Sequence, residues 1–375
     1  MESSTVTDLD AKHPGLTNDL TEPGTAGPRR GPIRWYRTAV SPEDLRALQQ
    51  RSDLLGGLQA GGYLALLILT GTLAYFSCGR AAWWVTLLLT FGHGTCFAFQ
   101  INPVHELCHG TVFRTPVLNE IFKRLFSFIG WINFPMFSKG HATHHRFTLH
   151  PPHDLEVTLP IRIRLRQFFL KAFVNPTYGE GIWAIGEALR IARGRFQGDA
   201  ELTLFPAGDP DRRRPIRWAR ALLAGHALLV AVAVAAALMG HPRFLMIPVL
   251  ITFGQWYGGW LFFLCNNSQH IGLRNDVADF RLCSRTIELN PVVQFLYWHM
   301  NFHIEHHMYT QVPCYRLGRL HRLIERDLPP SPRGLVQTWR QIAAIQARQD
   351  DDPHYQYHAT CPGPSRHTEA HVFVP

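Results

Sequence analysis

A histidine pattern with metal-binding chemistry occurs twice in this chain of 375 residues. Each copy has a pair at positions i and i+4, then a spacer, then a triplet at i, i+3 and i+4. In chain order the members are His105, His109, His141, His144, His145, Asn266, His270, His303, His306 and His307. The spacer is 32 positions in the first copy and 33 in the second. Histidines scattered over a surface or a core would not repeat this spacing, so the pattern predicts two half-sites of one metal centre.

The spacing is that of an α-helix. Positions i, i+3 and i+4 lie on one helical face, about 5–6 Å apart at Cβ. Imidazole nitrogen suits iron, copper, zinc and nickel, whereas calcium and magnesium prefer oxygen ligands. Nine histidines are too many for one tetrahedral zinc, which takes about four ligands. They fit two ions with four or five ligands each.

Four apolar segments must position these residues. The chain is 46% hydrophobic and only 17% charged, against about 25% charged in soluble domains. The apolar residues gather in the segments 54–76, 81–104, 221–239 and 244–265. Each is close to the roughly 20 residues that a helix needs to cross a bilayer. Short turns join them in pairs, so we predict four transmembrane helices in two hairpins.

Arginine placement predicts the orientation of these helices. The turn after each first helix holds one arginine, Arg80 or Arg243, while the N-terminal tail, the segment 105–218 and the C-terminal part are rich in arginine. By the positive-inside rule both termini and the long middle segment face the cytosol. The protein is then a multi-pass membrane protein of the endoplasmic reticulum in a eukaryote, or of the inner membrane in a bacterium. This also explains the net charge of +9 without nucleic acid as a partner.

The chain divides into three parts by composition. Residues 1–50 form an N-terminal cytosolic tail that we expect to be mostly disordered, because the stretch is rich in Thr, Gly and Pro. Residues 51–330 form the membrane domain, and residues 331–375 a C-terminal cytosolic tail that is polar from about Gln349. The seven cysteines are scattered and predict no disulfide framework.

The predicted fold is an all-α integral membrane protein with a cytosolic helical cap. The second helix of each hairpin runs directly into a histidine pair, which therefore lies just beyond the membrane surface. The triplets lie on cytosolic segments that fold back over the pairs. A metal centre at this junction can meet a lipid-soluble substrate from the bilayer and a soluble electron donor from the cytosol.

Three of the histidine groups resemble the histidine boxes of the membrane fatty acid desaturase superfamily. They are His105-x-x-x-His109, His141-x-x-His144-His145 and His303-x-x-His306-His307. Asn266-x-x-x-His270 resembles a further ligand pair of acyl-CoA desaturases, and the resemblance covers roughly residues 85–330. It implies a non-haem di-iron oxidoreductase that uses O2 and electrons from an external ferredoxin or b-type cytochrome. It also implies that the nine histidines are iron ligands, and that Asn266 acts through a water molecule.

The predicted reaction is the removal of hydrogens from unactivated C–H bonds of a lipid-like substrate, with formation of a C=C bond. No side chain can do this by acid–base chemistry, so an oxidising metal is needed. Hydroxylases, ketolases and acetylenases share these boxes, so monooxygenase-type chemistry remains an alternative. The substrate can be a fatty acyl, terpenoid or polyketide chain.

Carboxylates are expected beside the ligands, because metal-bound imidazoles usually donate their other N–H to a carboxylate or a carbonyl. Glu106 and Glu305 lie inside the boxes and are the predicted carboxylates of the catalytic centre. Asp154 and Glu156 are a second pair of candidates, with a solvated loop as the alternative. His93 lies in a membrane segment, and we expect it to be a hydrogen-bonded packing residue.

Two other classes of protein compete with this interpretation. His105-Glu106-x-x-His109 also matches the zinc metalloprotease motif, with Glu106 as the general base. That function leaves seven patterned histidines unexplained. A metal transporter would have its ligands within the spanning segments, where only His93 and His226 lie.

Overall fold

The computed structural model describes residues 33–157, 159 and 182–362. The predicted disorder of the N-terminal tail falls mainly on residues outside this described part. The chain divides into a short N-terminal unit, Met1–Ile33, and one compact unit, Arg34–Pro375. The described residues form helices and no β-strand, apart from the isolated bridges Tyr36–Asp279 and Glu288–Arg333. The predicted all-α class is therefore confirmed for the described residues.

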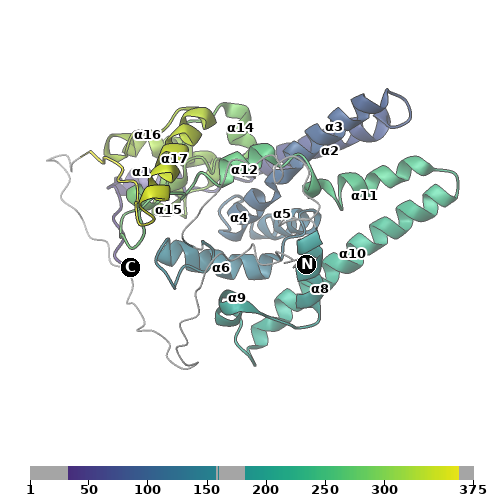
Figure 1. The fold of residues 1–375 in the computed structure, drawn as a ribbon, viewed down its shortest axis with the longest axis horizontal. Coiled ribbons are helices and arrows are strands. Elements are labelled where there is room, and N and C mark those ends of the chain that lie inside the picture. Colours follow the sequence, from purple (N-terminus) through teal and green to yellow (C-terminus); the bar gives the residue numbers. More distant parts are fainter. Residues whose placement is uncertain (1–32, 158, 160–181, 363–375) are drawn as a thin grey trace, which may run out of the picture. The chain divides into compact units, whose positions relative to one another are not determined.

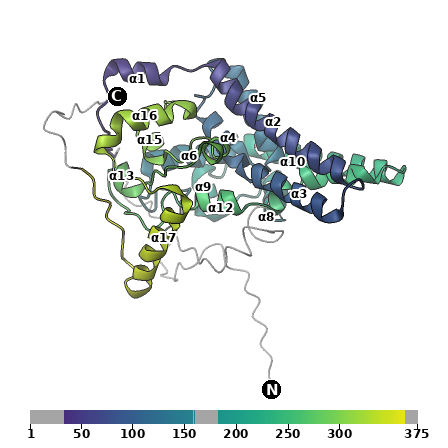
Figure 2. The same ribbon diagram turned by 90° about the horizontal axis from the view of Figure 1, so that it is seen from above.

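The first predicted hairpin consists of two long apolar helices. Helix α2 (Asp53–Ser77) begins where the Ser52 hydroxyl accepts a hydrogen bond from the Leu55 amide, at 3.2 Å. The returning helix α3 (Trp83–Phe97) continues through η1 (Ala98–Gln100) into α4 (Ile101–Cys108). Figures 1 and 2 both show α2 and α3 side by side. The second member of this hairpin thus leads directly into the first histidine pair.

A third long apolar helix starts the second predicted hairpin. Helix α10 (Arg213–Leu238) follows the short η2 (Pro210–Arg212), and it ends before Gly240, whose φ of +94° a glycine adopts without strain. Large apolar side chains such as Leu228, Val232 and Leu238 are exposed on it. Such a surface suits contact with lipid. In the described part of the chain, three helical stretches are long and apolar enough to cross a membrane: Asp53–Ser77, Trp83–Cys108 and Pro210–Leu238.

The fourth predicted span, 244–265, is not one continuous helix. The turn η3 (Pro242–Leu245) leads into three short pieces: α11 (Met246–Leu250), η4 (Gly254–Trp256) and α12 (Trp260–Asn266). Pro248 has no N–H to continue a helical ladder. At Gly258, with φ +74°, a side chain would lie 2.5 Å from the backbone nitrogen of Thr95. The glycine lets this broken segment pack closely against α3, and the prediction of four spanning helices in two hairpins is not confirmed.

Shorter helices form the cap around the histidines. Two of them carry the triplets, α6 (Phe134–Phe147) and α15 (His303–Met308). The others are α1 (Pro42–Gln49), α5 (Pro116–Ile129), α8 (Ile182–Ala192), α9 (Gly198–Leu204), α13 (Phe280–Cys283), α14 (Pro291–Leu296), η5 (Cys314–Arg316), α16 (Leu317–Ile324), η6 (Glu325–Asp327) and α17 (Gly334–Asp351).

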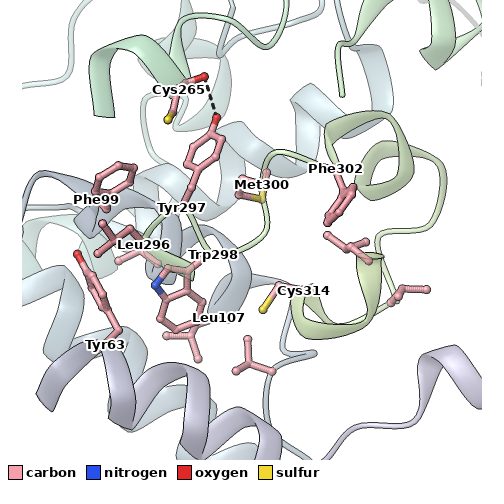
Figure 3. Packing of buried hydrophobic residues seen from close by; sticks show 14 of the residues in the cluster. Tyr63, Phe99, Leu107, Cys265, Leu296, Tyr297, Trp298, Met300, Phe302 and Cys314 are labelled. Atoms are coloured by element: carbon pink, nitrogen blue, oxygen red, sulfur yellow. Dashed lines mark hydrogen bonds between the residues drawn. The ribbon is translucent and has the colours of Figure 1, made fainter. Parts of the chain in front are cut away.

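An aromatic core joins the membrane helices to the cap. Figure 3 shows Trp298 and Tyr297, which precede the third box, lying among side chains of α2, α4 and the α3–α4 connection. Both aromatic side chains are almost completely buried, and the Tyr297 hydroxyl donates a 3.1 Å hydrogen bond to the carbonyl of Cys265. This packing fixes the segment that leads into α15 relative to the end of α12.

The segment predicted as a C-terminal tail contains a packed helix. In α17 the apolar residues Trp339, Ile342 and Ile345 recur at helical spacing and are buried. The indole of Trp339 donates a hydrogen bond to the carbonyl of Leu264, at 3.0 Å. Only the last residues of this helix belong to the stretch that is polar from about Gln349, and Gln349 itself is buried. Residues 363–375 lie outside the described residues.

Candidate metal centre

The structure gathers all nine patterned histidines into two adjacent groups. Within each group, potential ligand nitrogens lie within 4.8 Å of one another. The first group has five members: His105, His109, His141, His145 and His306. The second has four members: His144, His270, His303 and His307. Each group thus has the number of ligands that one ion requires.

The middle histidine of each triplet crosses to the other group. His144 of α6 joins the group that contains the pair His303 and His307, and His306 of α15 joins the group that contains His141 and His145. Positions i and i+4 are one turn apart on nearly the same side of a helix, whereas i+3 is displaced around the axis. Two facing helices can therefore each contribute two ligands to one centre and one to the other.

The ring nitrogens in each group point toward one another. The Nε2 atom of His141 lies 3.2 Å from Nε2 of His109 and 2.8 Å from Nε2 of His145. In the second group Nε2 of His303 lies 2.9 Å from that of His270 and 3.1 Å from that of His307.

These short distances fit bound metal. Imidazoles bound to an ion at about 2.0–2.1 Å lie about 3 Å apart when their bonds are at right angles. A single N–H cannot satisfy three converging ring nitrogens. One ion in each group can, so the donor sets fit two imidazole-preferring ions.

Several of these imidazoles are held in the neutral form, which binds metal. Burial lowers the pKa of His145, His306 and His307 well below the usual value, and the neighbouring imidazoles lower it further. These side chains are therefore neutral at pH 7, with a free lone pair. A neutral imidazole is the metal-binding form of histidine.

Three carboxylates are hydrogen-bonded to Nδ1 atoms of the patterned imidazoles. The acceptors are Glu106 for His105 at 2.9 Å, Asp154 for His144 at 2.9 Å and Glu156 for His141 at 2.8 Å. In each case the hydrogen bond to Nδ1 leaves Nε2 free to face the centre. The alternative of a solvated loop does not describe Asp154, which is buried against His144.

The loop after the second box is built around Asp154. Its carboxylate accepts hydrogen bonds from the backbone amides of Leu149, Glu156 and Val157, at 2.9, 3.0 and 3.1 Å. Burial disfavours protonation of His144, but Asp154 and Glu156 outweigh this effect and raise its pKa. The sequence analysis named both acidic residues as candidates, but it could not distinguish this role from a solvated loop, because the loop that carries them has no regular periodicity.

Glu305 has different partners from those expected. The hydroxyl of Thr286 donates a 2.5 Å hydrogen bond to its carboxylate, and Nδ1 of His321 donates another. Neither partner belongs to the nine histidines. Glu305 therefore links α15 to α16, whereas Glu106 lies directly against a ligand imidazole.

Asn266 lies at the end of α12 beside the second group. It lines a cavity of about 340 Å³ together with histidines of both groups, including His105, His144 and His303. The cavity provides space next to both sets of ring nitrogens. A small reactant or part of a larger substrate can therefore approach both centres at once.

The buried membrane histidines stay outside both groups. His93 is hydrogen-bonded to the Thr70 hydroxyl at 2.9 Å and to the Leu250 carbonyl at 3.1 Å. His226 is bonded to the Phe128 carbonyl at 2.9 Å. Both pack helices together, as expected for His93, and neither supports a line of ligands through the membrane segments.

The position of Glu106 does not suit the general base of a zinc protease. Its carboxylate lies on the Nδ1 side of His105, and 3.5 Å from Nδ1 of His306. A general base must instead face the substrate and the metal-bound water. The segment that matches the zinc motif is therefore better described as a histidine pair with a carboxylate on Nδ1 of His105.

Comparison with known proteins agrees with this geometry. A family model described as fatty acid desaturase matches residues 81–339. The matched region contains all nine histidines and Asn266. No curated protein matches the chain.

Proposed function

Because this chain belongs to the fatty acid desaturase family, we propose that it is an O2-dependent di-iron membrane oxidoreductase. Its proposed reaction removes two hydrogens from neighbouring carbons of a lipid-like substrate and introduces a C=C bond. The observation that carries this proposal is the convergence of five and four imidazoles in two adjacent groups.

The proposed cofactor is a pair of iron ions, one in each histidine group. Iron bound there would supply oxidising power, from O2 and from the electrons of an external ferredoxin or b-type cytochrome, against unactivated C–H bonds. The chain itself contributes neutral imidazoles, which keep iron in place without adding charge. Asn266 is proposed to act on the four-histidine group through a water molecule, because it lines the cavity beside it.

Three carboxylates are proposed as positioning residues. Glu106, Asp154 and Glu156 accept the Nδ1 protons of ligand imidazoles and hold the rings in their tautomer and orientation. Glu305 is proposed to act further out, by fixing α15 through Thr286 and His321. None of these groups needs to exchange a proton with the substrate.

The proposed location is the cytosolic face of a membrane. Three apolar helices support membrane insertion, and the first histidine pair lies at the end of the stretch Trp83–Cys108. The arginine-rich segments favour the cytosol for the termini and for the metal centre. A substrate dissolved in the bilayer and a soluble redox protein can then reach the same centre from opposite sides.

Metal analysis and product analysis together test this function. The purified protein should hold about two irons per chain, one for each histidine group. Expression in a lipid-producing host should yield a lipid lighter by two hydrogens, detected by mass spectrometry. His306→Ala is the matched control, because it removes one ligand of the five-histidine group without touching the cavity lining. A single zinc and no new lipid would contradict the proposal, and a product heavier by one oxygen would identify a hydroxylase of the same family.

A further inference from the structure

The cavity beside the two histidine groups contains a polar side chain that the metal centre does not use. Asn102 lies on α4, is only 3% exposed and lines this cavity. Its Oδ1 atom is buried, and no residue in the described part of the chain donates a hydrogen bond to it. Buried acceptors are nearly always paired, because losing water without gaining a partner is unfavourable. This unpaired oxygen therefore points to a ligand that donates a hydrogen bond.

Asn102 lies close to the reacting region. It precedes His105 by three positions on the same helix, so the two side chains share a face with Cβ atoms about 5–6 Å apart. The cavity is also lined by His144 and His303 of the second group. A ligand group bound to Asn102 would thus lie within a few bonds of any carbon that approaches both centres.

Apolar side chains also line the cavity beside Asn102. Ile101, Phe137, Val157 and Met300 line the same cavity and suit a hydrocarbon chain. The carboxamide of Asn267 is already engaged, because its nitrogen donates to the carbonyl of Phe263 at 2.9 Å. The rest of the lining is polar and includes histidines, Glu156 and Gln269, so the cavity can contact a hydrocarbon chain and also fix the orientation of a polar group.

We propose that the substrate is a lipid that carries a hydroxyl or an amide N–H close to the carbons that are oxidised, and that Asn102 binds this donor. This inference rests on the proposed function, and it narrows the substrate class. An unsubstituted hydrocarbon segment would leave the Asn102 oxygen unpaired. A donor-bearing lipid would satisfy it and fix which carbons face the histidine groups.

Binding of matched lipid pairs tests the inference. The full-length protein is placed in phosphatidylcholine nanodiscs, since this lipid has neither a hydroxyl nor an N–H. The probes are hexadecanol against hexadecyl methyl ether, and N-methylhexadecanamide against N,N-dimethylhexadecanamide. We expect one or both donor-bearing probes to bind about tenfold more tightly than the methylated partner. The pair that shows the preference identifies the donor as hydroxyl or amide.

Two variants distinguish hydrogen bonding by Asn102 from its contribution to packing. Asn102→Leu should bind both members of each pair alike, whereas Met300→Leu, in the same cavity, should keep the preference. Asn102→Ala serves the same purpose if Asn102→Leu does not fold. Equal binding of both members by the wild-type protein, or a preference that survives in the Asn102 variants, would overturn the inference.

Iron content and lipid oxidation are measured on the same preparation. An iron-loaded, active enzyme without donor preference overturns only the inference about Asn102. A preparation that holds a single zinc overturns the proposed function instead, whichever probe it prefers.

Discussion

The Nε2 atoms of His145 and His306 lie 3.2 Å apart, although 161 positions separate the two residues in the chain. His145 belongs to α6 and His306 to α15, so this contact joins the two triplets directly. Neither helix alone can complete a five-ligand site. The proposed metal centre therefore depends on the packing of the two halves, and its proposed ligands and orienting carboxylates can be tested separately.

Replacement of His303 by alanine should abolish turnover. Its Nε2 atom lies between those of His270 and His307, so its loss leaves the second group with three imidazoles. We expect iron to fall from about two to about one per chain, because ligand number sets metal retention. Metal analysis of the purified variant measures this, and His241→Ala, in the exposed turn after α10, is the control that should change nothing.

Glu106→Gln should weaken the enzyme without inactivating it. The amide oxygen can still accept the Nδ1 proton of His105, but it carries no charge to strengthen that bond. Loss of such an outer partner typically lowers metal affinity by about 10–100-fold. Competition with a chelator measures the affinity. An inactive Glu106→Gln beside an active His303→Ala would reverse the assignment and favour Glu106 as a general base.

Asp154→Asn should release metal from the second group more readily than from the first. Asp154 orients His144 and also accepts three backbone amides, so the change disturbs both the ligand and its loop. We expect a loss of affinity of about 10–100-fold. Stepwise removal of iron with a chelator distinguishes the two centres. Asp211→Asn, at an exposed position, is the matched control, and equal behaviour of the two variants would argue against an orienting role.

His93→Ala should keep the metal and lose stability. The imidazole joins Thr70 of α2 to the Leu250 carbonyl of α11, so its removal breaks both hydrogen bonds and takes this partner from the buried Leu250 carbonyl. The expected cost is roughly 1–3 kcal/mol. A lower thermal unfolding midpoint with unchanged iron content supports this role, whereas loss of iron would place His93 among the ligands.

Trp339→Ala should destabilise the cap. The side chain is 8% exposed, and its indole N–H donates to the carbonyl of Leu264. It thereby holds α17 against α12, just before Asn266 and His270. Removal of a buried tryptophan costs roughly 3–5 kcal/mol. The thermal unfolding midpoint should fall clearly, while Val336→Ala on the exposed face of α17 should leave it unchanged.

The long apolar helices show how much of the fold can be predicted from hydrophobic periodicity and composition. The apolar segments 54–76 and 81–104 predict α2 and the helical run that ends at Cys108. A continuous apolar segment of that length usually forms a membrane-spanning helix. The segment 244–265 is just as apolar, yet it is broken around Gly258. Pro248 and Gly258 are visible in the sequence, but the close approach of Gly258 to the backbone of Thr95 is a tertiary contact that the segment alone does not reveal.

By itself, the sequence determined which histidines meet. The spacing i, i+3 and i+4 is a local property of the helix, so it identified all nine members before any fold was known. Only the tertiary structure decided how they divide, with His144 and His306 exchanged between the groups, because that division depends on how α6 and α15 face each other. Only the tertiary structure also decided the contact between Asp154 and His144. This contact arises because a loop folds back onto His144, and spacing along the chain does not encode it.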